Sequence, residues 1–130
     1  MNEHETKTIN AFIVKEKRER YKLLLSNSKK RRVALDHLNH SHDLDEKYVT
    51  WLSSNASVER MLRHEGSPEE VYVISDTKEI DGRLMPLSEA LSETFSGGWG
   101  TIISCIPGQL AYYYDERGDR EAILKRKPSA

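Results

Sequence analysis

The sequence predicts a single α+β domain, in which helices from the first half pack on one face of a small, mostly antiparallel sheet from the second half. Two patterns support this prediction. Before Gly66, apolar residues recur every three or four positions, as they do on one side of a helix. From Val71 onward, short runs of β-branched and aromatic residues alternate with turn residues, which is typical of strands.

The helices of the first half are expected at about residues 9–25, 29–39 and 57–65. In the first of these, Ile9, Phe12 and Leu24 fall on one apolar stripe, and basic residues occupy the opposite side. A further short helix is expected to carry Tyr48 and Trp51.

The second half is expected to contain strands at about residues 70–75, 100–106, 110–115 and 120–125, with a helix at about 86–95. The last three strands would form an antiparallel meander. The first strand is joined to them through the helix, and a crossover of that length permits parallel pairing. Pro107–Gly108 favours a type II turn, whose twist suits a hairpin poorly, so we expect a longer loop or a bulge there.

Three consecutive tyrosines occupy the strand expected at 110–115. Tyr112 and Tyr114 would point to one face of the sheet and Tyr113 to the other. Because both faces carry aromatic rings, we expect both to be covered and the strand to lie centrally in the sheet.

One domain, residues 1–130, accounts for the whole chain, with residues 1–7 and 127–130 expected to be frayed. A single cysteine cannot form an internal disulfide, so the composition does not indicate a secreted, disulfide-bonded fold. The first ten residues are polar, unlike a signal peptide, and no apolar run approaches the roughly 20 residues of a membrane span. We therefore expect a cytoplasmic protein without a membrane partner.

Charge is distributed unevenly along the chain. Residues 1–66 carry 13 Lys/Arg against 10 Asp/Glu, whereas residues 67–130 carry 7 against 11. Such an imbalance can mark a surface for nucleic acid or for an acidic partner, and it can equally be the solvated side of a helix. The candidate residues of this basic surface are Lys15, Arg18, Lys22, Lys29, Lys30, Arg31 and Arg32.

The sequence Gly97-Gly98-Trp99-Gly100 resembles a phosphate-binding loop only in composition. Phosphate-binding loops run from strand to glycines to helix, so that the amino end of the helix faces the anion. Here the glycines follow a helix and lead into a strand, so they are expected to end the helix and to allow a close backbone crossing. Trp99, flanked by glycines, is the candidate contact residue for a partner.

Two features suggest catalytic or metal chemistry. Cys105 would be a nucleophile if a nearby histidine lowered its pKa, but a cysteine beside isoleucines on a strand is more often a buried apolar residue. A cluster of metal-type ligands comprises His37, His40, His42, Asp43 and Asp45. Its spacing matches no established zinc signature, and histidines and aspartates are also ordinary residues at helix ends. No cofactor is therefore expected.

These observations favour a non-enzymatic interaction or regulatory module whose partner is another protein or a second copy of the chain, as in a homodimer. The first alternative is a nucleic-acid-associated protein that uses the basic surface. The second alternative is a small enzyme that uses the His/Asp cluster or Cys105.

Overall fold

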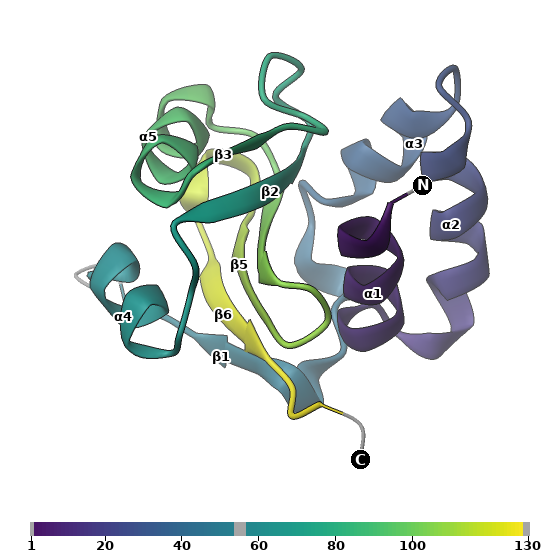
Figure 1. Cartoon of the computed structure of the whole chain (residues 1–130). Coiled ribbons are helices and arrows are strands. Elements are labelled where there is room, and N and C mark those ends of the chain that lie inside the picture. The colour runs from purple at the N-terminus through teal and green to yellow at the C-terminus, as the bar shows by residue number, and fades with distance from the viewer. Residues whose placement is uncertain (1, 54–56, 129–130) are drawn as a thin grey trace.

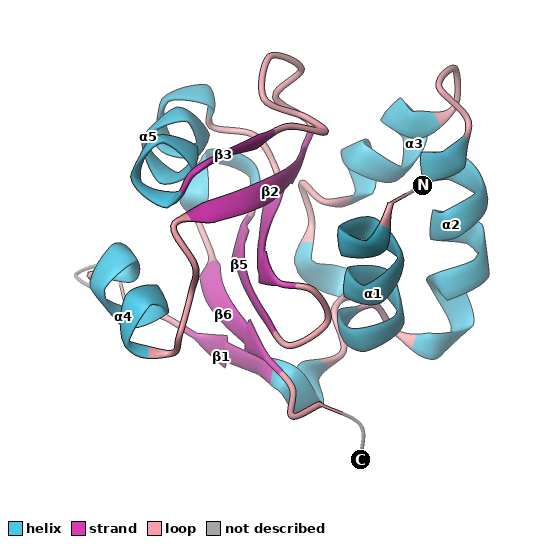
Figure 2. Cartoon of the chain, viewed as in Figure 1, coloured by secondary structure: helices cyan, strands magenta, loops and turns pink. Residues whose placement is uncertain are grey.

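The computed structural model describes residues 2–53 and 57–128 and has three layers (Figure 1). Its helices are α1 (Glu3–Phe12), α2 (Arg18–Ser26), α3 (Arg31–His37), α4 (Val58–His64) and α5 (Leu87–Gly97). The first three pack on one face of a central sheet, and α4 and α5 pack on the other, as the view by secondary structure shows (Figure 2). The α+β class is confirmed. The expectation that all helices of the first half pack on one face is wrong, because α4 lies on the face opposite α1, α2 and α3.

The six strands of the sheet are β1 (Val49–Trp51), β2 (Glu70–Ser75), β3 (Leu84–Pro86), β4 (Thr101–Ile106), β5 (Leu110–Tyr114) and β6 (Glu121–Lys125). Their order is β1-β6-β5-β4-β2-β3, and every neighbouring pair is antiparallel. The four expected strands are present. Tyr48 ends a short 3-10 helix, Glu46–Tyr48, but the rest of the expected short helix, as far as Trp51, is instead the edge strand β1, because pairing with β6 outweighs the local helical pattern.

The pairing of β2 also differs from the expectation. Strand β3 reverses the chain beside β2, so α5 connects β3, and not β2, to β4. Strands β3 and β4 both run antiparallel to β2 and are therefore parallel to each other, on either side of it. The helix is thus a crossover between two parallel strands that are not neighbours.

The helix expected at about residues 9–25 is replaced in the structure by two separate helices, α1 and α2. The chain is extended at Ile13, which forms an isolated antiparallel bridge with Leu44, and the Val14 N–H donates to the Asp43 carbonyl oxygen at 2.8 Å. Two consecutive β-branched residues adopt this extended conformation readily. Helix α1 also starts earlier than expected, so residues 3–7 are helical and not frayed. At the other end, residues 129–130 lie outside the described residues.

The three tyrosines alternate across the sheet as expected, and β5 is central. Tyr113 packs in the core beneath the N-terminal helices, and Tyr112 and Tyr114 pack in the core beneath α4 and α5. The turn between β4 and β5 also meets the expectation. The Gln109 N–H donates to the Ile106 carbonyl oxygen at 2.9 Å, and the pairing register shifts between Ser104 and Ile106, which is a bulge.

Thr8 is a buried threonine whose hydroxyl group is unsatisfied. Its Oγ1 has no hydrogen-bond partner, and it lines a small apolar cavity between α1, α2, α3 and the sheet. Because an unpaired buried hydroxyl group is costly, Thr8→Val is expected to raise the free energy of unfolding by about 1 kcal/mol. Thr94 is the matched control, since it is equally buried in a helix but donates to the Ala90 carbonyl oxygen at 2.7 Å. Thr94→Val should lower the stability in the same urea titration, and a loss of stability in both variants would contradict the prediction.

Candidate interaction site

The segment Gly97–Gly100 joins α5 to β4, as the order of helix, glycines and strand predicts. Gly98 follows the helix in the left-handed conformation, with φ of 71°, and its N–H donates to the Thr94 carbonyl oxygen at 3.1 Å. Because the carboxyl end of a helix presents carbonyl groups, this segment is unsuited to hold a phosphate. Trp99 follows Gly98 and is 45% exposed, as a contact residue would be.

Gly97 and Gly100 are positions of close approach. A Cβ atom at Gly97 would lie 2.5 Å from Thr77 Oγ1, and a Cβ atom at Gly100 would overlap the carbonyl group of Leu38. The Gly100 N–H also donates to Asn39 Oδ1 at 2.6 Å. The end of α3, the β2–β3 loop and the start of β4 are therefore packed tightly together, and they present Trp99 from a rigid support.

A hollow of about 750 Å³ lies beside Trp99, between α3, the β2–β3 loop and the end of α5. Arg32 lines this hollow, and its guanidinium group lies 3.4 Å from the Asp76 carboxylate. Lys78 and Glu79 also line it and are exposed. The hollow therefore combines an aromatic ring with charges of both signs, which suits a mixed protein surface better than a uniformly charged ligand.

A second exposed aromatic residue lies one turn earlier on α5. Phe95 is 46% exposed, and its ring packs against those of Tyr112 and Tyr114, with centroids 6.3 and 5.7 Å away. It borders another hollow of about 680 Å³ between α4, α5 and the β5–β6 turn. The ring is thus supported from beneath and remains open to contact.

The β5–β6 turn lines the hollow beside Phe95 and also contacts the segment that carries Trp99. The Arg117 N–H donates to the Gly98 carbonyl oxygen at 2.7 Å, and the exposed Arg117 has φ of 62°. We name the region of Phe95, Trp99 and Arg117 the α5 end surface. Tryptophan, other aromatic residues and arginine are the residue types most enriched at the energetic centres of protein interfaces.

The sequence suggested Trp99 as a contact residue but did not point to Phe95 or Arg117. Leu87, Leu91 and Phe95 are spaced four apart, which suggests one buried stripe. With 3.6 residues per turn, however, a spacing of four drifts around the helix, and two such steps rotate Phe95 by roughly 80° from Leu87. Leu87 is consequently buried, and Phe95 is exposed.

The candidate basic surface is partly occupied by contacts within the chain. Residues held in this way are Arg18, Lys22, Arg31 and Arg32. The remaining candidates, Lys15, Lys29 and Lys30, are exposed. The charge that this segment can offer to a partner is therefore smaller than its composition suggests.

Arg31 in particular is a structural residue. Its guanidinium group lies 2.7 Å from the Glu5 carboxylate and 2.7 Å from the Asp81 carboxylate. The Tyr72 hydroxyl group also donates to Glu5, which is buried. These contacts join α1, α3, β2 and the β2–β3 loop.

The His/Asp candidates do not form one cluster. Buried Asp43 accepts hydrogen bonds from Lys17 at 2.7 Å and from the Tyr21 hydroxyl group at 2.5 Å. Burial alone would raise the pKa of Asp43, but these hydrogen bonds outweigh it and hold the pKa below its usual value. His37 lies 3.5 Å from the same carboxylate.

His40 and His42 lie apart from Asp43, in a hollow that they line together with Asp115 and Asp119. Asp45, the last of the candidates, lies 4.0 Å from Arg18. Within residues 2–53 and 57–128, no three His, Cys, Asp or Glu side chains are placed to share a metal ion.

A serine–histidine pair links α1 to β4. His4 Nδ1 lies 2.8 Å from Ser104 Oγ, and the His4 ring stacks on Tyr72. Burial lowers the pKa of His4. Since Ser104 is fully buried, its hydroxyl group is closed to a substrate, and the pair serves to fix α1 on β4.

Cys105 is buried among apolar residues on the face covered by α4 and α5, and burial raises the pKa of its thiol to about 11. Asp43 and its neighbour His37 lie far from it, since their partner Tyr21 belongs to the core on the opposite face of the sheet. This geometry argues against Cys105 as a nucleophile, which requires a thiolate. The native protein is therefore expected to react with the thiol reagent DTNB only slowly at neutral pH, and fully once unfolded in urea. Rapid reaction of the native protein would contradict this placement.

Every helix in the described parts of the chain is too short or too polar to cross a membrane. In comparisons with known proteins, no family model, no curated protein and no solved structure matches this chain significantly.

Proposed function

We propose that this protein is a non-enzymatic interaction module that binds a protein partner through the α5 end surface. The observation that supports this proposal most is the exposure of Trp99 and Phe95, two large aromatic residues four positions apart, on a support fixed by close glycine packing. Solvent-exposed aromatic rings with little conformational freedom are typical centres of binding energy.

Photo-crosslinking tests this proposal. The photoreactive residue p-benzoylphenylalanine replaces Trp99 in one variant and Leu23, an exposed apolar residue on α2, in the control variant. The partner should be captured from position 99 and not from position 23. Mass spectrometry of the adduct distinguishes another protein from a second copy of this chain.

Binding of the purified partner is the decisive measurement. Truncation of a central aromatic residue costs at least about 2 kcal/mol at many interfaces, so Trp99→Ala should weaken the affinity roughly 30-fold. Leu23→Ala should leave the affinity unchanged. Equal capture at both positions, or an affinity that is insensitive to Trp99→Ala, would refute the proposal.

Nucleic-acid binding remains the alternative proposal, supported by exposed Lys15, Lys29 and Lys30. Affinity for an oligonucleotide should then fall steeply with salt and fall further when these lysines are replaced by glutamine. Arg31 is unsuitable for this test, because its replacement would disturb the fold. The enzyme alternative has less support, given the burial of Cys105 and the separation of the His/Asp candidates.

A further inference from the structure

We propose that a hollow formed by α1, the β4–β5 turn and the segment after β6 binds a phosphate group of a small molecule. This site is separate from the α5 end surface and does not depend on the proposed function. The hollow has a volume of about 420 Å³, within the usual range of small-molecule sites.

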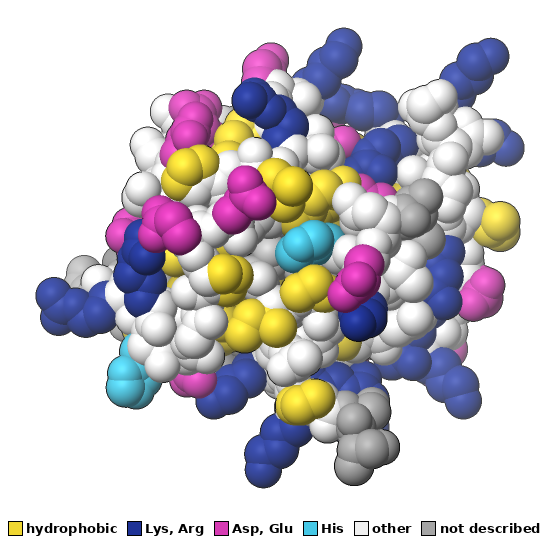
Figure 3. Space-filling model, viewed as in Figure 1, with side chains coloured by type: hydrophobic (Ala, Val, Ile, Leu, Met, Phe, Trp, Pro, Cys, Tyr) yellow, Lys and Arg dark blue, Asp and Glu magenta, His cyan; other side chains and the backbone are white. Residues whose placement is uncertain are grey.

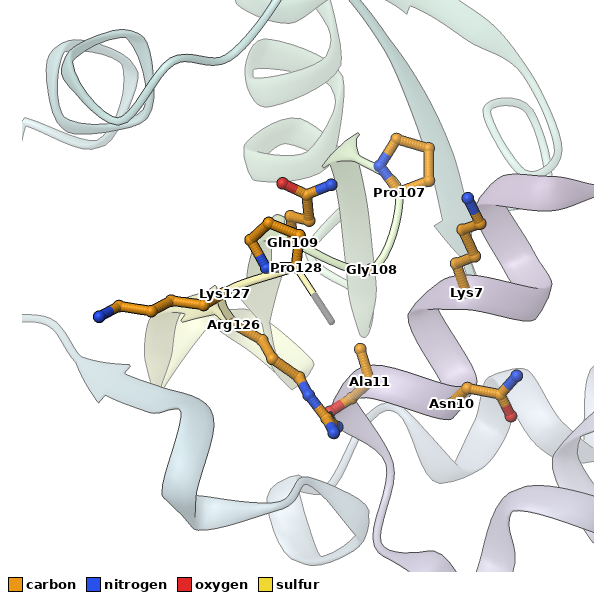
Figure 4. Close-up of a pocket in the computed structure, with 9 residues that line it drawn as sticks. All are labelled: Lys7, Asn10, Ala11, Pro107, Gly108, Gln109, Arg126, Lys127 and Pro128. Atoms are coloured by element: carbon orange, nitrogen blue, oxygen red, sulfur yellow. Dashed lines mark hydrogen bonds between the residues drawn. The ribbon is translucent and has the colours of Figure 1, made fainter. Parts of the chain in front are cut away.

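Three segments that are distant in the sequence converge on this hollow (Figure 4). Its charged lining side chains are Lys7, Arg126 and Lys127, and no carboxylate lines it among the described residues. Asn10 and Gln109 add side-chain amide groups, which can donate hydrogen bonds. The hollow thus has Lys7 and Arg126 in its wall, Lys127 at its edge and further hydrogen-bond donors, a combination that matches a small anion.

Arg126 is the fixed part of this site. Its backbone N–H donates to the Gln109 carbonyl oxygen at 2.9 Å, and its guanidinium group donates to the Ala11 carbonyl oxygen at 3.2 Å. The guanidinium carbon also lies 4.5 Å from the centre of the Tyr48 ring. Figure 4 shows the side chain directed toward Asn10 and Ala11. An arginine that is already ordered loses little conformational entropy when it binds.

Several other arginines of the chain differ from Arg126 in their partners. The guanidinium groups of Arg31, Arg32 and Arg63 each lie within 3.4 Å of a carboxylate. No carboxylate pairs with Arg126 in the described residues, so most of its five N–H groups are available. A phosphate oxygen is the partner that this planar group binds best.

The carboxyl end of α1 lies beside the hollow and opposes an anion, but its effect is small. A helix end carries about half a negative charge, and the Arg126 guanidinium group already covers the Ala11 carbonyl. Lys7 pairs with Glu3 at 3.1 Å, and because this pair is exposed it contributes little and is easily exchanged. The three cationic groups therefore dominate the local potential. Lys127, which extends away from the hollow in Figure 4, adds to this potential without a fixed contact.

An amide-resolved NMR titration with inorganic phosphate at constant ionic strength tests the proposal. Saturable shifts are expected at Lys7, Gly108, Gln109 and Arg126. Replacing Arg126 with glutamine should weaken phosphate binding about tenfold, because a charge-assisted contact is lost. Lys7→Gln should weaken it more modestly. Arg60→Gln, which removes an exposed cationic side chain on α4, on the opposite face of the sheet from α1, is the control and should not change the affinity.

The variants also separate loss of binding from loss of fold. Arg126→Gln also removes the contact with Ala11, so each spectrum first has to show native dispersion, and Lys7→Gln provides a second variant on an exposed side chain. Shifts that are linear in phosphate concentration, or an equal loss in Arg60→Gln, would overturn the proposal. A parallel titration with a single-stranded oligonucleotide distinguishes the source of the phosphate. Binding of the oligonucleotide alone, with no saturable binding of phosphate, would also overturn it.

Discussion

Arg31→Ala is expected to lower the free energy of unfolding by about 3–5 kcal/mol, the largest effect of any single substitution considered for this protein. The guanidinium group of Arg31 donates to both oxygens of Glu5 and to both oxygens of Asp81. Glu5 is only 3% exposed, so the alanine variant would leave a buried carboxylate without its counter-charge. Urea unfolding followed by circular dichroism measures the difference.

The neighbouring arginine provides a matched control. Arg32 also contacts a carboxylate, that of Asp76, but its own side chain is 60% exposed. Because exposed ion pairs contribute between 0 and about 1 kcal/mol, Arg32→Ala should cost no more than that. Similar losses of stability in the two variants would contradict the prediction that the buried contacts of Arg31 stabilise the fold more than the exposed pair of Arg32.

Gly100→Ala is expected to destabilise the protein by about 3 kcal/mol or more. The added methyl group would overlap the Leu38 carbonyl group and lie 2.6 Å from the Asn39 nitrogen. Overpacking against side chains typically costs 1–3 kcal/mol, and backbone atoms have fewer ways to move aside. Thermal and urea unfolding of the purified variant would give the magnitude.

Gly98→Ala separates this steric effect from the effect of backbone conformation. Gly98 has a left-handed backbone, but no other atom lies within 4 Å of the position its Cβ would take. Its substitution should therefore cost only the roughly 1–2 kcal/mol of the strained conformation. A larger loss at Gly98 than at Gly100 would contradict the account of the Gly97–Gly100 segment as a point of close packing.

The parts of the fold that sequence analysis predicted depend on local patterns. The alternation of Tyr112 and Tyr113, the bulge next to Pro107–Gly108 and the helix end at Gly98 all follow from the conformational preferences of a few adjacent residues. Helix α3 and strands β2, β4, β5 and β6 were found within one or two residues of their observed bounds for the same reason.

The parts that were missed depend on distant contacts. Strand β1 exists because Val49 pairs with Leu124, and α1 ends where Ile13 pairs with Leu44. Trp99 was proposed as a contact residue from its glycine neighbours alone, and the structure shows it to be exposed. The hollows beside it, and the hollow around Arg126, are built from segments whose proximity no local pattern encodes.

The contact between His4 and Ser104 spans 100 positions and has a consequence during synthesis. The segment that contains Ile9 and Phe12 leaves the ribosome before the strands that cover its apolar side have been made. At about 5–20 residues per second, roughly 5–20 s pass before β4 follows α1. During that interval the nascent chain exposes an apolar segment, and exposed apolar segments of this kind are what chaperones bind.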